Sequence, residues 1–207
     1  MRINCTYMAS GFSRRFGGNK LLYEIGGKQM FEYGLEALST AKRQLAAENI
    51  NLDIIVVTSY EKILKRAEEG GIKAEYNSSP EDGITSSIHL GLADRDVDIN
   101  PDPDINEAKD IAGFMFFVAD QPYMKAESIA NLVRIFCNGN KGIASVISNG
   151  RRSSPAIFDK KYKSELLDLT GDTGGSSIIK RNQEDIAYVE VERAEIVDID
   201  RIDDLIE

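Results

Sequence analysis

Two patterns of apolar residues alternate along the 207-residue chain. Short continuous apolar runs, such as IIVVT at 54–58 and FMFFVA at 114–119, are typical of strands that are buried on both faces. Between them lie stretches with apolar residues three and four positions apart, which is typical of amphipathic helices. The alternation predicts an α/β fold, a parallel sheet with helices on its faces. The expected strands cover residues 3–8, 54–58, 72–76, 114–119, 143–147 and 187–191, and the expected helices 29–47, 61–69, 85–93, 128–136, 161–169 and 176–180.

Composition narrows the class of protein. Apolar residues make up 42% of the chain and charged residues 29%, which is ordinary for a globular domain. The formal net charge of −9 repels phosphate backbones and anionic lipids, so we expect neither nucleic acid nor a membrane as a partner. The N-terminal segment MRINCTYMAS is too polar for a signal sequence, and no apolar run is long enough to cross a bilayer. These features predict a soluble, cytoplasmic protein.

Side chains that commonly form metal sites or catalytic triads are scarce. Cys5 and Cys137 are the only cysteines, and they form no C-x-x-C pair, so we expect two reduced thiols. His89 is the only histidine, which excludes a His-rich metal site and leaves little room for a serine or cysteine triad. We expect it to pack on a helix. The acidic stretch 94–110 lacks the spacing of a calcium loop and is predicted to be a solvated connection.

The segment MASGFSRRFGGNK, residues 8–20, follows the first expected strand. Open α/β sheets bind ligands at the carboxyl ends of their strands. Glycines let successive N–H groups point into one concavity, and Arg14, Arg15 and Lys20 supply positive charge suited to several phosphates. The segment matches neither a P-loop nor G-x-G-x-x-G. Its residues alone leave two interpretations open, an anion-binding loop and a flexible charged turn.

Asp120 follows the most hydrophobic expected strand, in FFVADQP. Its carboxylate should therefore emerge at the same sheet edge as the glycine-rich segment. A carboxylate that faces a phosphate loop requires a cation between them, and a divalent ion such as magnesium suits oxygen ligands. The alternative is that Asp120 caps a turn before the next helix.

Four further segments carry weaker signals. The first turn of the helix expected at 85–93 holds hydroxyls that suit either a nucleotide or a helix cap. GRRSSPAIF, residues 150–158, is expected to be a turn with two arginines, and LTGDTGGSS, residues 169–177, a glycine-rich turn that opens a helix. VDIDRIDDL, residues 197–205, is expected to place Asp198 and Asp200 at the end of a strand, where either could approach a metal.

Taken in order, these motifs resemble those of the molybdenum cofactor cytidylyltransferases, within the MobA-like NTP transferases. The resemblance covers nearly the whole chain, and it is carried by MASGFSRRFGGNKLL, GITSSIHLGL, FFVADQP, SPAIF, LTGDTGGSSII and VDIDRIDDL. It implies a Rossmann-like, GT-A-like three-layer fold with a mostly parallel mixed sheet. It also implies one nucleotidyltransferase domain over 1–207, with 1–120 binding the nucleotide and 121–207 facing the acceptor. Arg152-Ser153-Ser154-Pro155 departs from the family's Gly-Asn-Pro element.

The resemblance assigns roles residue by residue. It gives Lys20, Arg14 and Asp120 as catalytic residues, and Asp120 with Asp200 as ligands of Mg²⁺ or Mn²⁺. It implies a nucleotide site formed by Met8, Ala9, Ser10, Gly11, Ser13, Arg14, Arg15, Lys20, Asn77, Gly83, Thr85, Ser86 and Ser87. It implies an acceptor site formed by Arg151, Arg152, Ser154, Asp172 and Gly174.

The implied reaction transfers CMP from CTP to the phosphate of a pterin, molybdopterin, and releases pyrophosphate. Two alternatives stay open at this point. One is a guanylyl- or sugar-phosphate nucleotidyltransferase of the same fold. The other is a nucleotide-binding accessory protein that serves a client molybdenum hydroxylase.

Overall fold

One seven-stranded mixed sheet forms the centre of the computed structural model, which describes residues 1–13, 15–93 and 111–205. The strand order is β5-β4-β1-β6-β8-β7-β9. Within this sheet β8 alone runs antiparallel to its neighbours, and all other pairs are parallel. The α/β class and the mostly parallel mixed sheet are confirmed. The strands are β1 (Arg2–Ala9), β4 (Asn51–Thr58), β5 (Lys73–Tyr76), β6 (Ile111–Val118), β7 (Ile143–Ser148), β8 (Arg151–Asp159) and β9 (Ile186–Glu190).

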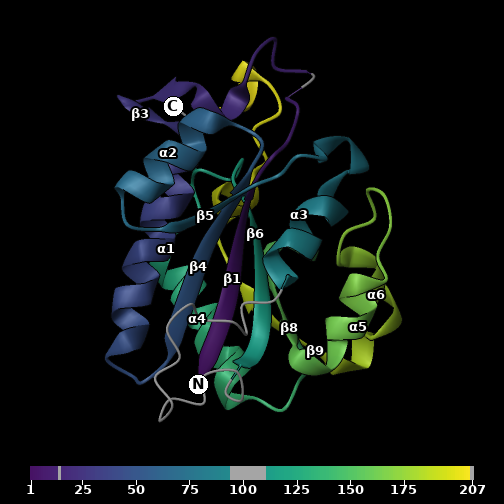
Figure 1. Ribbon diagram of the computed structural model, residues 1–207. Coiled ribbons are helices and arrows are strands. Elements are labelled where there is room, and N and C mark those ends of the chain that lie inside the picture. Colours follow the sequence, from purple (N-terminus) through teal and green to yellow (C-terminus); the bar gives the residue numbers. More distant parts are fainter. Residues whose placement is uncertain (14, 94–110, 206–207) are drawn as a thin grey trace, which may run out of the picture.

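Helices cover both faces of the sheet and give three layers (Figure 1). One face carries α1 (Met30–Ala46), α2 (Glu61–Glu69) and α4 (Ala126–Asn138), and the other carries α3 (Ile84–Leu92), α5 (Lys163–Leu167) and α6 (Ser176–Arg181). Each expected helix is present, with bounds that differ by a few residues. The 3₁₀ turns are η1 (Lys20–Leu22), η2 (Pro80–Asp82), η4 (Lys160–Tyr162), η5 (Gln183–Asp185), η6 (Arg193–Ile196) and η7 (Ile202–Asp204).

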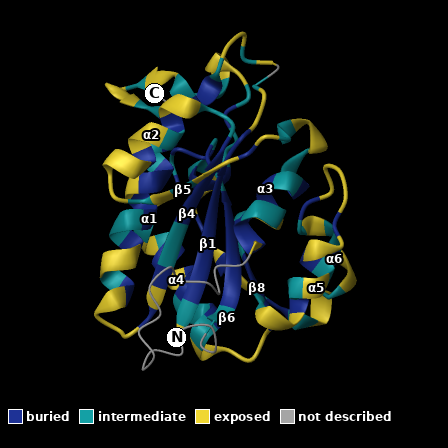
Figure 2. Cartoon of the chain, viewed as in Figure 1, coloured by how far each residue is buried: buried dark blue, intermediate teal, exposed yellow. Residues whose placement is uncertain are grey.

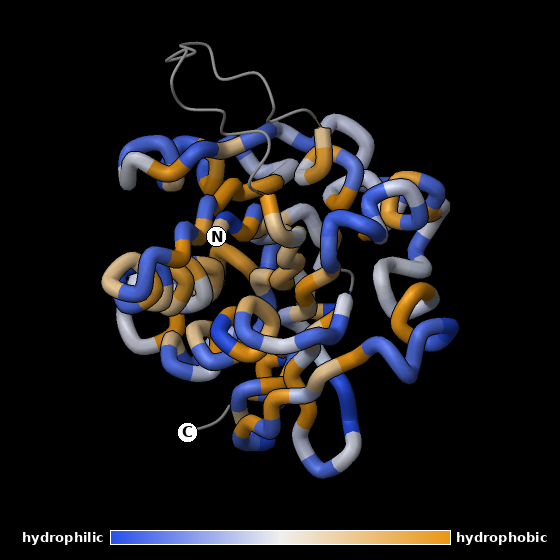
Figure 3. The backbone as a smooth tube through the Cα atoms, turned by 90° about the horizontal axis from the view of Figure 1, so that it is seen from below, coloured by the Kyte–Doolittle hydropathy of each residue, from blue (hydrophilic) through white to orange (hydrophobic). Residues whose placement is uncertain are grey.

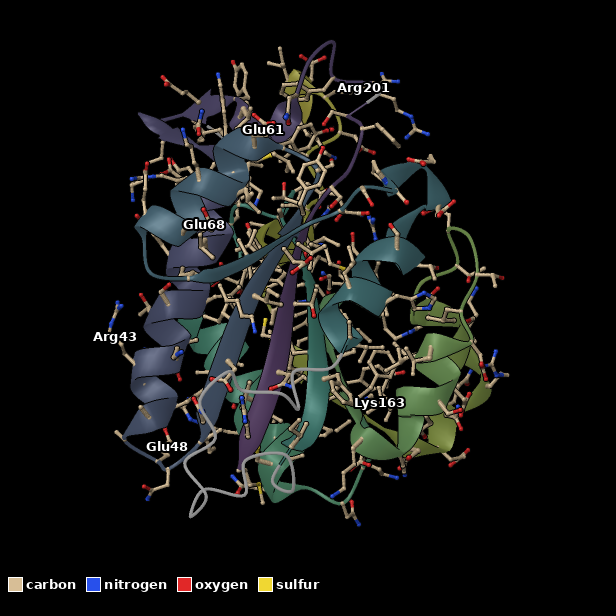
Figure 4. All side chains as sticks on the ribbon, viewed as in Figure 1. Arg43, Glu48, Glu61, Glu68, Lys163 and Arg201 are labelled. Atoms are coloured by element: carbon tan, nitrogen blue, oxygen red, sulfur yellow. The ribbon has the colours of Figure 1, made fainter. Side chains whose placement is uncertain are left out.

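The sheet separates two apolar cores because its strands present buried residues on both faces. On the α1 side, Tyr7 is fully buried and its hydroxyl donates a 2.7 Å hydrogen bond to the Phe31 carbonyl of α1. On the other side, Met8 packs with Ile88 of α3 and Phe158 of β8. Figure 2 shows the central strands buried and the outer helix surfaces exposed, and Figure 3 shows apolar residues gathered between the layers. Charged side chains such as Arg43 and Glu68 point outward (Figure 4).

Residues 150–158 were expected to form a turn, and this prediction is wrong, because Arg151–Asp159 form strand β8. It pairs antiparallel with both β6 and β7. Asn149 and Gly150 form the two-residue loop between β7 and β8, and both have positive φ, 49° and 79°. Asn-Gly is the preferred sequence for this hairpin turn, so a signal was present. The strand was missed because residues Arg151–Ser154 are polar, so only the second part of β8 shows an apolar pattern.

Two further corrections concern short segments. Residues 197–200, expected at the end of a strand, follow the 3₁₀ turn Arg193–Ile196 and form no strand. A small hairpin of β2 (Glu24–Ile25) and β3 (Lys28–Gln29) was not predicted, although Gly26 and Gly27 supply the positive φ angles of its turn.

Several other expectations have clear outcomes. Within the described residues, Cys5 and Cys137 form no disulfide, and His89 lies on α3 as predicted. Neither the connection expected at 94–110 nor Arg14 lies within the described residues. Across residues 1–13, 15–93 and 111–205, no helix combines the length and the apolar content that a bilayer span requires.

The close approach of α3 to β1 leads to a stability prediction. A Cβ added at Gly91 would contact the Thr6 side chain, 2.6 Å from its Cγ2. Overpacking of this kind costs about 1–3 kcal/mol, which exceeds the gain of up to about 1 kcal/mol from replacing glycine in a helix. We therefore expect Gly91→Ala to lower the free energy of unfolding measured with urea. At Gly18 an added Cβ meets nothing within 4 Å, so Gly18→Ala is the control and should leave this free energy unchanged.

Candidate functional site

A cavity of about 720 Å³ opens at the carboxyl ends of β1 and β6. It brings together the beginning and the end of the glycine-rich segment, the start of α3 and Asp120. Figure 1 shows the loop after β1 and the C-terminal segment at this same end of the sheet. The lining includes the predicted residues Met8, Ser10, Gly11, Ser13, Lys20, Gly83, Ser87, Asp120 and Asp172.

Lys20 lies at the centre of the site, between two carboxylates. It is only 6% exposed, and its Nζ lies 2.7 Å from Asp120 Oδ2 and 2.9 Å from Asp200 Oδ1. Its backbone N–H donates to Ser13 Oγ at 3.1 Å, which ties the end of the glycine-rich segment to its beginning. Burial by itself would lower the pKa of Lys20, but the charge and hydrogen bond of Asp120, joined by Asp200, outweigh burial and raise it. Lys20 is therefore a charged ammonium at neutral pH.

The C-terminal segment reaches the site through one backbone hydrogen bond. The N–H of Ile199 donates to the Asp120 carbonyl at 2.9 Å, and the Ile199 side chain is fully buried. Asp198 and Asp200 flank this anchor and take different partners. Asp200 bonds Lys20, which lowers the pKa of its carboxyl. Asp198 Oδ1 accepts from Gln121 Nε2 at 2.7 Å, and burial followed by the charge of Asp120 raises its pKa.

The donor set suits a hard divalent cation. Asp120 Oδ1 is buried, and no hydrogen-bond partner for it occurs within the part of the chain that the structure describes. The carboxylate of Asp200 lies nearby, because Lys20 Nζ contacts both Asp120 and Asp200. The described residues contain no cluster of three or more His, Cys, Asp or Glu side chains that could hold a metal. A cation here would therefore take its remaining ligands from water or from a bound phosphate, as magnesium commonly does.

The start of α3 forms the opposite wall. Gly83, with φ of 78°, precedes the helix, and an added Cβ there would lie 2.9 Å from Asp172 Oδ1. Asp172 accepts the Ile84 N–H at 3.1 Å, so the glycine-rich turn at 169–175 docks on the first turn of α3. Asn77 is 1% exposed and donates to the hydroxyls of Ser86 and Ser87 at 2.9 and 3.2 Å. The cavity lining includes Gly83 and Ser87 but neither Asn77, Thr85 nor Ser86.

The predicted acceptor residues are divided between two cavities. Arg152 and Ser154 line a second cavity of about 270 Å³, which shares Met8, Ile84 and Val118 with the first. Ser154 Oγ accepts the Val118 N–H at 3.0 Å, which fixes β8 against β6. Asp172 lies on the first cavity. The lining of neither cavity includes Ala9, Arg15, Arg151, Gly174 or Asp200, although Arg15 and Arg151 lie 3.4 and 3.7 Å from Asp200 and Asp198.

Gln121 is a site residue that the sequence analysis did not identify. It is 1% exposed, and its Nε2 donates to both Ser153 Oγ and Asp198 Oδ1 at 2.7 Å. It therefore connects the end of β6 to β8 and to the C-terminal segment. Its position directly after Asp120 was the available signal, because residues that follow a strand end share its edge of the sheet.

The comparison with protein families identifies the class of domain. Residues 5–186 match the family described as the MobA-like NTP transferase domain. The chain belongs to this family. Among curated relatives, a protein of Thermococcus gammatolerans named probable molybdenum cofactor guanylyltransferase is 32% identical over 89 residues, 42% of each chain. One of the same name from Pyrococcus horikoshii is 34% identical over 92 residues, 44% of this chain and 45% of the relative. These matches span less than half the length of the relatives.

Solved structures share the fold of this MobA-like domain. Rv0371c from Mycobacterium tuberculosis, solved in complex with manganese, has a TM-score of 0.73 and 16% identity over 99% of this chain and 96% of that one. A nucleotidyl transferase from Methanothermobacter gives 0.72 and 17%, over 98% and 93%. The molybdopterin-guanine dinucleotide biosynthesis protein A of Archaeoglobus fulgidus gives 0.66 and 16%, over 99% and 94%. At these identities the likeness establishes the fold.

The Lys20–Asp200 contact predicts a pH dependence of stability. The pKa of Asp200 is lower in the folded than in the unfolded protein. Its contact with Lys20 therefore contributes to the free energy of unfolding above the unfolded pKa, about 3.9, and this contribution is lost as the pH falls through the folded pKa. We expect Asp200→Asn to be less stable than the wild type at pH 7. The difference, measured by chemical denaturation, should shrink below about pH 4. Asp203→Asn, an exposed carboxylate nearby, is the control. A difference that persists unchanged in acid would contradict the role given to this contact.

Proposed function

We propose that this MobA-like domain transfers a nucleotidyl group from a nucleoside triphosphate to the terminal phosphate of molybdopterin, with release of pyrophosphate. One observation carries the proposal. A buried lysine pairs with two aspartates at the carboxyl ends of parallel strands, and this lysine and Asp120 line a cavity of about 720 Å³ together with the glycine-rich loop. Such a cavity is large enough for a nucleotide, and its position is the usual ligand site of open α/β sheets.

Each side chain at the centre has a role in this reaction. The backbone of Ser10, Gly11 and the neighbouring loop would bind the phosphates through N–H groups. Lys20 would neutralise charge on the triphosphate. Asp120, through its Oδ1, which has no hydrogen-bond partner among the described residues, and Asp200 would hold Mg²⁺ or Mn²⁺. When bound, the metal would polarise phosphate oxygens and offset the charge of the leaving group.

The chemistry requires no strong general base. An oxygen of the acceptor phosphate forms a bond to the α-phosphorus while the bond to the β-phosphate oxygen breaks, and pyrophosphate leaves. A phosphate monoester has a second pKa of about 6, so the nucleophile is largely ionised at neutral pH. Catalysis then depends on alignment and on charge stabilisation, which Lys20 and the loop would supply.

The second cavity supports the placement of the acceptor. It meets the first cavity at Met8, Ile84 and Val118, so an acceptor there would lie beside the nucleotide. Its walls include Phe116 and Phe158, and Arg152 adds a positive charge that suits a phosphorylated ligand. These features support Arg152 as an acceptor residue. An apolar slot with one cation is consistent with a flat ring that carries a phosphate.

The identity of the base divides the proposal into two candidates. The order and content of the motifs, above all LTGDTGGSSII and VDIDRIDDL, favour CTP. The names of the curated relatives favour GTP, because both proteins described above are named probable molybdenum cofactor guanylyltransferase. We propose CTP as the substrate and GTP as the second candidate.

Pyrophosphate release from CTP, GTP, ATP and UTP, each with purified molybdopterin, tests the proposal. We expect release that requires both the acceptor and a divalent metal, and that is fastest with CTP. Faster release with GTP would assign the guanylyl reaction instead. Saturable nucleotide binding without release from any of the four would indicate a nucleotide-binding accessory protein. Transfer to sugar phosphates in place of molybdopterin would indicate a sugar-phosphate nucleotidyltransferase.

The central ion pairs predict the effect of two substitutions. Lys20→Met removes a cation that would neutralise the triphosphate, and Asp120→Asn removes a carboxylate that would hold the metal. Loss of one charge-stabilising group costs about 10²–10³ in turnover. We expect each variant to lose at least about a hundredfold in kcat while it remains folded by circular dichroism. Lys28→Met, at a surface lysine that pairs with Glu36, is the matched control and should retain full activity. Full activity in either site variant would exclude the assigned roles.

A further inference from the structure

Three consecutive hydroxyl side chains, at the last residue of β4 and the two residues after it, donate to three consecutive carbonyls, at the last residue of β1 and the two residues after it. Thr58 Oγ1 donates to the Ala9 carbonyl at 2.8 Å, and Ser59 Oγ donates to the Ser10 carbonyl at 3.4 Å. The Tyr60 hydroxyl donates to the Gly11 carbonyl at 2.6 Å. The parallel register of β1 and β4 pairs Ala9 with Thr58, so the two segments leave the sheet side by side.

This pattern determines which way the loop peptides face. In a planar trans peptide the carbonyl and the following N–H point in opposite directions. Because the carbonyls of Ala9, Ser10 and Gly11 all face the residues after β4, the N–H groups of these peptide units face the opposite side. On that side lies β6, whose end carries Asp120. Ser10 and Gly11 line the main cavity together with Asp120. Successive N–H groups that point into one concavity form an anion-binding nest.

We propose that Thr58, Ser59 and Tyr60 are positioning residues that hold the loop with its N–H groups toward the phosphates of the nucleotide. The inference rests on the proposed function and adds residues that neither the motifs nor the comparisons assign. It gives the segment after β4 a part in substrate binding although it contributes no lining residue to the cavity.

The surroundings of the three hydroxyls support this role. Thr58 is fully buried, and its Oγ1 also accepts the Tyr60 N–H at 3.1 Å, which fixes the direction of the following residues. Ser10 Oγ donates in return to the Val57 carbonyl at 3.3 Å. Burial raises the pKa of the Tyr60 hydroxyl, so it remains a hydrogen-bond donor at neutral pH.

Nucleotide affinity tests the inference when it is measured apart from catalysis. The variants are Tyr60→Phe and Thr58→Val, which remove a donor with little change of shape, and Thr58→Ser, which keeps it. One hydrogen bond is worth about 0.5–1.5 kcal/mol, or up to about tenfold in an equilibrium constant. We expect the Kd for CTP or GTP with Mg²⁺, by calorimetry, to rise about three- to tenfold in Tyr60→Phe and Thr58→Val. Thr58→Ser should retain wild-type affinity, and in the transfer assay KM should rise more than kcat falls.

Tyr76→Phe, at an exposed tyrosine at the end of β5, is the control and should bind like the wild type. Unfolding midpoints measured on the same samples separate loop orientation from a loss of fold. Equal nucleotide affinity in wild type, Tyr60→Phe and Thr58→Val would overturn the positioning role and leave the proposed function standing. If the wild type binds none of the four nucleotides, both the proposed function and this inference are wrong.

Discussion

The site depends on one buried ammonium that contacts two carboxylates. Lys20 reaches Asp120 and Asp200, residues that lie 100 and 180 positions further along the chain. A charge that is nearly excluded from water is costly unless it is paired, so each of the three segments is held by the others. The loop after β1, the end of β6 and the C-terminal segment thus form one preorganised unit. The backbone bond from Ile199 to Asp120 adds a contact that does not depend on charge.

The sheet explains why this unit lies where it does. Strands β1 and β6 are parallel neighbours, so the residues that follow them emerge at one edge. Both strands are mostly apolar and buried on their two faces, and the polar residues that follow them lie at this edge. That geometry is why apolar runs in the sequence were sufficient to predict the layers and the proximity of Asp120 to the segment that follows β1. Strand β8 escaped prediction because Arg151 to Ser154 are polar, and its burial comes from neighbours on both sides rather than from its own composition.

Contacts that depend on the path of the chain between distant elements could not be predicted. The motif VDIDRIDDL does not by itself distinguish Asp198 from Asp200. In the fold, the backbone hydrogen bond of Ile199 to Asp120 places Asp198 beside Gln121 and Asp200 beside Lys20. The hydroxyls of residues 58–60 were equally indistinct, because Thr, Ser and Tyr at a strand end are ordinary turn residues. Their significance arises from the register of β1 against β4. Sequence position therefore predicted which edge carries the site, and tertiary structure determined which side chains meet there.

The charge balance of the site has a further consequence for ligand binding. Lys20 and the more exposed Arg15 and Arg151 each already contact an aspartate. A triphosphate that enters this arrangement brings several negative charges that these ion pairs do not offset. Among the described residues of the main cavity, positive potential for these charges can come from the N–H dipoles of the loop after β1, and a divalent cation that enters with the nucleotide would add to it. Dipoles carry no counter-charge that must be displaced, so their effect depends only on orientation. The hydrogen bonds that orient the loop carbonyls toward the end of β4 are therefore a condition for binding a polyanion to a protein with a net charge of −9.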